Sequence, residues 1–154
     1  EIYRCDWSSD VCSSDLDFAK SAACLDRSRL GKQRIEVLQL LNALSGKSGW
    51  SNHPCTRMWK GYQKALISYG MAICNEWKSR SYQDSVLPKI EEFLSFKFRV
   101  EAPEDLPPWI GREDFHASHR SNLLRKDETW YRAFGWTEST ELPYIWPLTR
   151  YSFE

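Results

Sequence analysis

The chain has 154 residues, of which 42% are apolar, and carries 21 Lys and Arg against 21 Asp and Glu. A chain of this length with eight Trp, seven Tyr and seven Phe closes one hydrophobic core, so we expect one domain. It has no run of about 18 apolar residues and no signal-peptide pattern, which excludes a membrane span and predicts a cytoplasmic location.

The first sixteen residues differ in character from the rest. Asp6 to Leu16, DWSSDVCSSDL, closely resembles a translated sequencing-library adapter, and EIYRC precedes it. We therefore interpret residues 1–16 as a non-native segment in place of the native start, and residues 17–154 as a single helical domain. Removing Arg4 and four acidic residues leaves 20 Lys and Arg against 17 Asp and Glu, a net charge of +3. The five Cys lack a CxxC motif and are expected to be free thiols.

Residues 17–24 are predicted to form a short helix, and the following stretch, Leu25 to Leu44, one long amphipathic helix. Asp26 is a plausible N-cap, and Gly46 supplies a stop just past the last apolar residue. At 100° per residue one broad stripe faces the core. This stripe contains Leu30, Val37, Leu38, Leu41 and Leu44.

A second face of this helix is polar. Arg29, Lys32, Gln33 and Glu36 stand at i, i+3, i+4 and i+7, which places three donors around one carboxylate. One interpretation is a solvated face with an ordinary Lys32 to Glu36 ion pair, worth a few tenths of a kcal/mol. The other is the floor of an active site.

A second long helix is predicted to begin at Pro54, with apolar positions at helical spacing as far as Trp77. Gly61 and Gly70 inside it indicate close approach of another helix. Asn52 and His53 precede it, and a helix N-terminus favours a phosphate. The alternative is that Asn52 is only a cap and His53 a surface residue.

The remaining elements are also helical or irregular. Residues 81–96 are expected to form a helix that begins or is disturbed at Pro88, followed by a proline-rich surface loop over 99–108. Residues 112–126 are predicted to be helical, with a short helix over 127–134 and an irregular tail over 136–154 that packs across the core. No strand pattern stands out. The fold class is mainly α, a small irregular bundle.

The predicted helix over 112–126 carries many side chains that bind phosphate. Such a helix favours contact with a nucleic-acid backbone, and the alternative is again a solvated face. The residues in question are His116, His119, Arg120, Ser121, Asn122, Arg125 and Lys126. A metal site built from His53, His116 and His119 is a weaker hypothesis, because HExxH and CxxC motifs are absent. We expect no metal and no cofactor.

Three stretches, taken in order, resemble a known family. They are LDRSRLGKQRIEVLQ from Leu25, NHPCTRMWKGYQKALISYGMAICNEWKSRSY from Asn52, and PPWIGREDFHASHRSNLLRKDETWYRAFGW from Pro107. Together they resemble small bacterial proteins related to the phage pyrimidine-dimer DNA glycosylase, endonuclease V. The resemblance implies one compact α domain that binds double-stranded DNA, flips a nucleotide and cleaves the glycosidic bond of a damaged or modified pyrimidine. It leaves open whether AP-lyase activity accompanies this cleavage.

The resemblance also implies residue roles. Glu36 matches the family's essential glutamate, and Arg29 falls where the phage enzyme has a DNA-contacting histidine. A second basic position of the phage enzyme falls on Ile35, beside Arg34. The family's nucleophile is the chain's own α-amine, which is absent here if residues 1–16 are foreign, leaving Lys32 as the nearest substitute amine.

The sequence thus predicts a monomeric, nucleoid-associated DNA glycosylase with Glu36 as its catalytic residue. Its expected DNA contacts outside the 112–126 helix are Arg29, Lys32, Gln33, Arg34, Asn52, His53 and Arg57. Two alternatives stay open: a DNA-binding module without catalysis, and a His-based metal-dependent hydrolase.

Overall fold

The computed structural model describes residues 18–46, 51–96 and 106–147. These residues form seven helices and no strand, which confirms the mainly α class. None of the described helices is long and apolar enough to cross a membrane.

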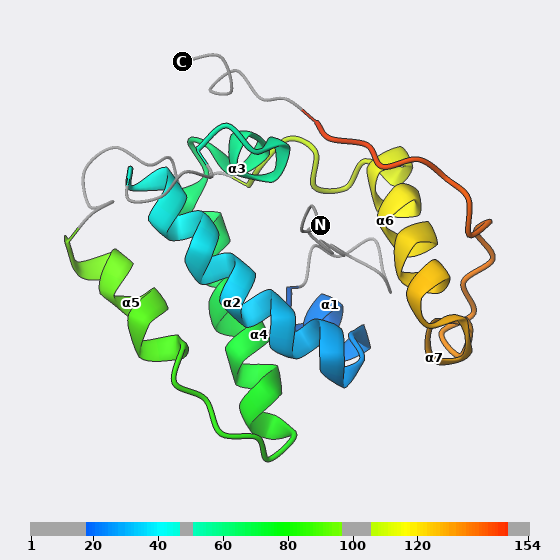
Figure 1. The fold of residues 1–154 in the computed structure, drawn as a ribbon, viewed down its shortest axis with the longest axis horizontal. Helices are drawn as coiled ribbons and strands as arrows, with labels where there is room; N and C mark the ends of the chain where they lie inside the picture. The colour runs from blue at the N-terminus through cyan, green and yellow to red at the C-terminus, as the bar shows by residue number, and fades with distance from the viewer. Residues whose placement is uncertain (1–17, 47–50, 97–105, 148–154) are drawn as a thin grey trace.

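The centre of the fold is α4 (Gln63–Ser79), which packs against α1 (Phe18–Cys24), α2 (Arg27–Leu44) and α5 (Leu87–Phe96) (Figure 1). The core between them is aliphatic, with Val37, Leu41, Leu66 and Ile73 fully buried. Gly70 allows the close approach of α2, since a Cβ added there would lie 2.6 Å from Cγ1 of Val37. The prediction of close helix packing at Gly70 is therefore confirmed.

Helix α2 begins two residues later than predicted and ends where expected. Asp26 occupies the N-cap position with extended backbone, but its carboxylate makes no capping hydrogen bond. Gly46 has φ +81°, a left-handed conformation that glycine adopts without strain, just after the C-cap Ser45. The predicted core stripe is correct, with Leu38 and Leu44 partly buried at its edges.

The second predicted helix is two helices. α3 (Pro54–Trp59) is followed by its C-cap Lys60, and α4 begins at Gln63. Gly61 has φ +84°, so it breaks the helix and does not sit inside one. The apolar spacing concealed the break, because Tyr62 stays buried on the same side as Met58 and Leu66.

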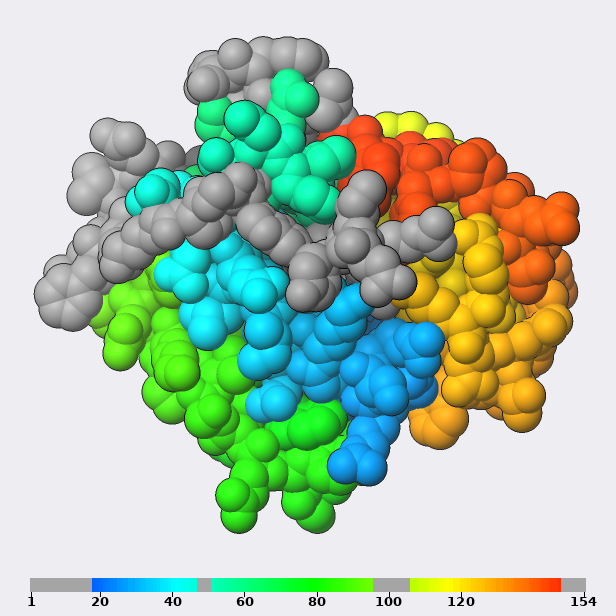
Figure 2. Space-filling model, in the orientation of Figure 1, coloured from blue at the N-terminus to red at the C-terminus, as the bar shows by residue number. Residues whose placement is uncertain are grey.

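The C-terminal part consists of α6 (Glu113–Lys126), α7 (Glu128–Arg132) and the irregular segment 136–147, called the tail below. Figure 1 and Figure 2 show the tail, in orange to red, beside α6. Helix α5 begins at Leu87 with Pro88 in its first turn, one of the two predicted alternatives. Most of the predicted loop over 99–108 lies outside the described residues.

Aromatic contacts join this C-terminal part to the helical core. Trp109 packs edge-on against Trp59 with 4.8 Å between ring centroids, and its indole Nε1 donates to the carbonyl of Met58 at 3.1 Å. Trp59 in turn stacks on Tyr69 of α4, while Trp109 contacts Phe115 of α6. Both Trp59 and Trp109 are almost completely buried. This aromatic bridge fixes α6 relative to α4.

Candidate active site

Helix α2 carries a polar cluster that we call the α2 polar group: Lys32, Gln33 and Glu36. Gln33 and Glu36 are 0% and 3% exposed, although both belong to the face predicted to be polar. Nε2 of Gln33 donates to Oε2 of Glu36 at 2.9 Å, and Nζ of Lys32 lies 3.5 Å from Oε1. The predicted Lys32 to Glu36 pair therefore exists, but its acidic partner is not a solvated surface residue.

The burial of Glu36 has an energetic consequence. A carboxylate removed from water is stable in its charged form only when donors or cations replace its hydration. The amide of Gln33 and the ammonium of Lys32 supply such partners, while the side chain of Lys32 remains 40% exposed. The arrangement presents a positive charge at the surface directly above a buried carboxylate.

The two arginines predicted beside this group point elsewhere. Nη1 of Arg29 lies 3.4 Å from Asp26, one turn before the α2 polar group. Arg34 pairs with Asp84 and stacks over Trp77, with Cζ 4.2 Å from the ring centroid. Arg34 is 13% exposed, so a structural contact with the α4–α5 connection occupies it.

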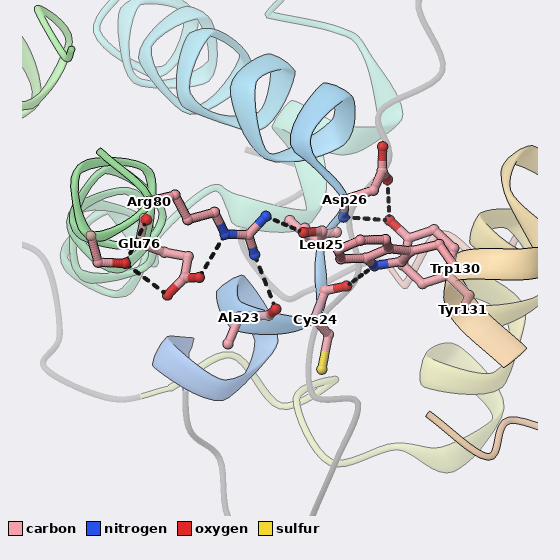
Figure 3. A network of polar contacts seen from close by, with 9 residues as sticks. Ala23, Cys24, Leu25, Asp26, Glu76, Arg80, Trp130 and Tyr131 are labelled. Carbon is pink, nitrogen blue, oxygen red and sulfur yellow. Dashed lines mark hydrogen bonds and ion pairs between the residues drawn. The ribbon is translucent and has the colours of Figure 1, made fainter. Parts of the chain in front are cut away.

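The start of α2 is held by Arg80, at the end of α4 (Figure 3). Its Nη1 and Nη2 donate to the carbonyls of Leu25 and Ala23 at 2.8 and 3.0 Å, and its Nε donates to Glu76 at 2.8 Å. The chain between α1 and α2 is thus fixed to α4 through backbone carbonyls that neither helix satisfies.

Helix α7 holds the same connection from the other side (Figure 3). The hydroxyl of Tyr131 donates to Asp26 Oδ1 at 2.5 Å and accepts from the Asp26 N–H, and the indole of Trp130 donates to the carbonyl of Cys24 at 2.8 Å. Burial, followed by the bond to Asp26, raises the pKa of Tyr131. Asp26 therefore joins α2 to α7, which explains why its carboxylate does not cap the helix.

In the loop before α3, Asn52 and His53 have the reverse of the roles that the alternative interpretation gave them. His53 is the N-cap, and its Nδ1 accepts from the Cys55 N–H at 3.2 Å, whereas Asn52 is exposed. Burial lowers the pKa of His53. Its ring meets the edge of Trp146 in the tail, and Arg57 is half-buried in the last turn of α3.

The polar residues of α6 face the tail. We call His116, His119, Arg120, Ser121, Asn122 and Arg125 the α6 strip; all except Arg125 are buried, and Lys126 beyond them is half-exposed. Ser121 Oγ donates to the Ser139 carbonyl and accepts from the Leu142 N–H, while Arg120 pairs with Glu113 and Glu138. Arg125 donates to the carbonyls of Thr140 and Leu142 at 2.7 and 3.2 Å. This burial speaks against the interpretation of the strip as an open phosphate-binding face.

The two histidines of the strip are also used internally. Nε2 of His116 accepts from the Gly111 N–H at 2.7 Å. His119 lies among Phe115, Tyr144 and Trp146, and burial, followed by the influence of His116, lowers its pKa to about 3. His119 is therefore neutral at pH 7 and brings no positive charge to a phosphate.

Among the residues that the structure describes, no group of three or more His, Cys, Asp and Glu side chains is arranged to hold a metal ion. His116 and His119 use their rings in the contacts above, and His53 caps α3. The metal-dependent hydrolase thus has no site in the described part of the chain.

Sequence reasoning missed Tyr69, whose hydroxyl donates to Oε1 of Gln33 at 3.1 Å. Its place in the apolar spacing of the second predicted helix indicated burial. Nothing in that spacing indicates which polar group its hydroxyl meets 36 residues away. Arg80 and Tyr131 were missed for the same reason.

The fold and this site define an all-α protein with a hydrogen-bonded carboxylate buried on its second helix, below an exposed lysine. A family model described as pyrimidine dimer DNA glycosylase matches residues 11–87, half of the chain, beginning inside the 1–16 segment and containing the whole α2 polar group. The chain belongs to the pyrimidine dimer DNA glycosylase family. No curated protein and no solved structure matches it.

Proposed function

We propose that the chain removes a damaged or modified pyrimidine from duplex DNA, with Glu36 as the catalytic carboxylate. The observation that carries this proposal is the buried Glu36, held by Gln33 and Lys32 on a helix inside the family match. Breaking a glycosidic bond develops positive charge on the sugar, and a carboxylate in a water-poor site stabilises such charge and moves protons.

Lys32 and Arg29 are the cations best placed to hold the DNA. Both keep solvent-exposed area on α2, with 40% and 24% of their side chains exposed, and both are close in sequence to Glu36. A target base inside a duplex must be flipped out before a carboxylate can reach its sugar. The phosphates that flank the flipped nucleotide would pair with Lys32 and Arg29. Duplex binding should therefore weaken as the salt concentration rises.

An α-amine nucleophile fits the same location. The ring of Phe18, the first described residue, packs edge-on against Tyr69 at 5.4 Å, and Tyr69 bonds to Gln33, the partner of Glu36. An extended residue spans about 3.5 Å, and we propose that a native amine a few residues before Phe18 acts beside Glu36. An α-amine with a pKa near 8 is partly unprotonated at pH 7, unlike an ordinary Lys.

The lyase step would follow from that amine. The amine attacks C1′, the base leaves with the electrons of the glycosidic bond and is protonated, and the ring-opened sugar forms an imine. Removal of a C2′ proton then expels the 3′ phosphate by β-elimination. Within the described residues, Lys32 also brings an amine close to Glu36, with Nζ 3.5 Å from Oε1.

The test uses the chain with its native start restored from the source DNA. We expect it to release bases from ultraviolet-irradiated duplex, to cleave an abasic duplex, and to be trapped on DNA by borohydride. Glu36→Gln should abolish base release while leaving duplex binding measurable. Glu76→Gln is the control, since Glu76 is also a carboxylate paired with a cation at i+4 but lies in α4 and is only partly buried, and it should retain activity.

Absence of cleavage, absence of an adduct and indifference to Glu36→Gln would overturn the proposal. Salt-dependent duplex binding without any base release would instead support the binding module without catalysis. Weakened binding in Arg125→Ala would then assign that binding to α6.

A further inference from the structure

Tyr69 and Gln33 form a hydrogen-bonded chain that ends on Glu36. The Tyr69 hydroxyl donates to Oε1 of Gln33 at 3.1 Å, and Nε2 of the same amide donates to Oε2 of Glu36 at 2.9 Å. All three side chains are almost completely buried, with exposures of 1%, 0% and 3%. These two hydrogen bonds connect α4 to α2 through the single side-chain amide of Gln33.

The direction of these bonds follows from the groups involved. An amide presents a donor at one end and an acceptor at the other, and a carboxylate accepts hydrogen bonds only. Gln33 must therefore turn its NH2 group to Glu36, which leaves its oxygen facing Tyr69. Burial, followed by the negative charge of Glu36, raises the pKa of Tyr69, so its hydroxyl keeps the proton that it donates. Reversing the amide would place oxygen against oxygen at Glu36.

The Tyr69 ring itself is held from two sides. Phe18 of α1 meets it edge-on with 5.4 Å between centroids, and Trp59 of α3 stacks against it at 6.2 Å. The neighbouring Gly70 permits the close approach of α4 to Val37 of α2. The hydroxyl is consequently fixed by packing before it meets Gln33, which makes it a preorganised donor.

We propose that Tyr69 is a positioning residue of this site. Its hydrogen bond fixes the orientation of the Gln33 amide, so that Gln33 donates to Glu36 and holds that carboxylate in its ionised form and in one orientation. The catalytic meaning of this role rests on the proposed function. The titratable groups of described residues near these three side chains include Lys32, whose Nζ lies 3.5 Å from Glu36, and Cys55 in α3, which also raises the pKa of Tyr69.

The first test compares Tyr69→Phe and Gln33→Met with the chain that has its native start. Tyr69→Phe keeps the ring and removes only the hydroxyl. We expect kcat to fall by about tenfold with KM nearly unchanged, because one bond to a charged group is weakened. A donor to the charged carboxylate favours ionisation, so the acid limb of the pH–rate profile should rise by about one pH unit.

The double variant separates positioning from general structural damage. If Tyr69 acts through Gln33, adding Tyr69→Phe to Gln33→Met should cause no further loss of kcat. Tyr131→Phe is the matched control, since it also removes a buried tyrosine hydroxyl bonded to a carboxylate system, but at Asp26. It should lower stability without moving the acid limb. Additive losses in the double variant, or equal pH shifts in both tyrosine variants, would overturn the proposal.

A measurement independent of activity distinguishes this inference from the proposed function. The carboxyl carbon of Glu36 can be titrated by NMR in the wild-type chain, in Tyr69→Phe and in Tyr131→Phe. We expect its midpoint to rise by about one pH unit in Tyr69→Phe alone. That shift in a protein without glycosylase activity would overturn the proposed function and support the positioning. An active enzyme without the shift would support the proposed function and overturn the positioning role of Tyr69.

Discussion

Helices α2 and α6 each carry a polar face, and the side chains of the two faces bind different groups. The α2 polar group contains a buried carboxylate with donors arranged around it and one cation reaching solvent. The α6 strip contains no carboxylate, and three of its members, Arg120, Ser121 and Arg125, bind the tail. Similar residue types at similar helical spacing thus produce a candidate reaction centre in one case and an internal support in the other.

The difference lies in what packs against each helix. Helix α2 faces α4, whose backbone hydrogen bonds are satisfied within the helix, so its polar side chains are left to bond with each other and with Tyr69. Helix α6 faces irregular chain, whose N–H and C=O groups have no helix or sheet ladder to satisfy them and bond to side chains of α6 instead. The hydroxyl of Ser121 and the guanidinium of Arg125 make these bonds. Among the described residues, the polar face of α6 is the one on which an irregular segment lies, and its side chains bind that segment.

The largest expected effect is that of removing the bridge between these two regions. Trp109→Ala deletes a 1% exposed indole that contacts Trp59 and donates to the Met58 carbonyl. We expect a loss of about 3 to 5 kcal/mol in the free energy of unfolding, measured by urea denaturation. Amides of α6 should lose protection from hydrogen exchange before those of α4. Leu94→Ala, at a 47% exposed position, is the control, and an equal loss there would contradict the prediction.

The next effect concerns pH and belongs to the α6 region. His119 has a pKa of about 3 in the folded protein against 6.5 for a free histidine, because burial disfavours its charged form. Between these values the unfolded chain binds one proton more, so stability should decrease as the pH falls, by about 1.4 kcal/mol per pH unit.

The variant His119→Phe checks this pH dependence. It keeps an aromatic ring beside Phe115, Tyr144 and Trp146 but cannot take up a proton. Unfolding free energies measured from pH 7 to pH 4 should therefore show a flatter slope in His119→Phe than in the wild-type chain. Parallel slopes in the two proteins would show that His119 titrates normally.

Local sequence signals predicted the helices well and one of their boundaries poorly. The apolar stripe and Gly46 located α2, because both act within a few residues. The break between α3 and α4 was missed, since Gly61 reads equally as a close-packing residue or as a left-handed turn. Only the three-dimensional neighbours decide between the two, and Gly70 shows the other outcome.

In the candidate site, too, only contacts between residues close in sequence could be predicted. The i, i+4 spacing predicted the contact of Lys32 with Glu36. Burial of Glu36 was not predictable, because it depends on α4 and on Tyr69, which is distant in sequence. The burial of the α6 strip was missed for the corresponding reason, since the tail that covers it has no periodic pattern that would place it there.

A smaller effect on stability is expected from Ser121→Ala, which tests whether the α6 strip binds the tail and not DNA. The change removes the donor to the Ser139 carbonyl and the acceptor of the Leu142 N–H. We expect a loss of about 1 to 3 kcal/mol in unfolding free energy and faster exchange of the Leu142 amide. Duplex binding by the folded protein should stay unchanged, whereas a weaker affinity would restore the strip as a DNA contact. Ser68→Ala, at an exposed position of α4, is the neutral control.

The smallest effect on stability is expected in the turn after α4, which contains Arg80, the residue that holds the start of α2. Ser81 follows α4 with φ +67°, a left-handed conformation that costs a residue with a Cβ about 1 kcal/mol. Its N–H and that of Tyr82 bond to carbonyls of the last turn of α4, a helix end that favours glycine. Ser81→Gly should therefore raise the unfolding free energy by roughly 0.5 to 1 kcal/mol. Ser79→Gly, at the last residue of α4, should lower it, because the change also removes the hydroxyl that donates to the Glu76 carbonyl. A loss in both variants would show that Ser81 is unstrained.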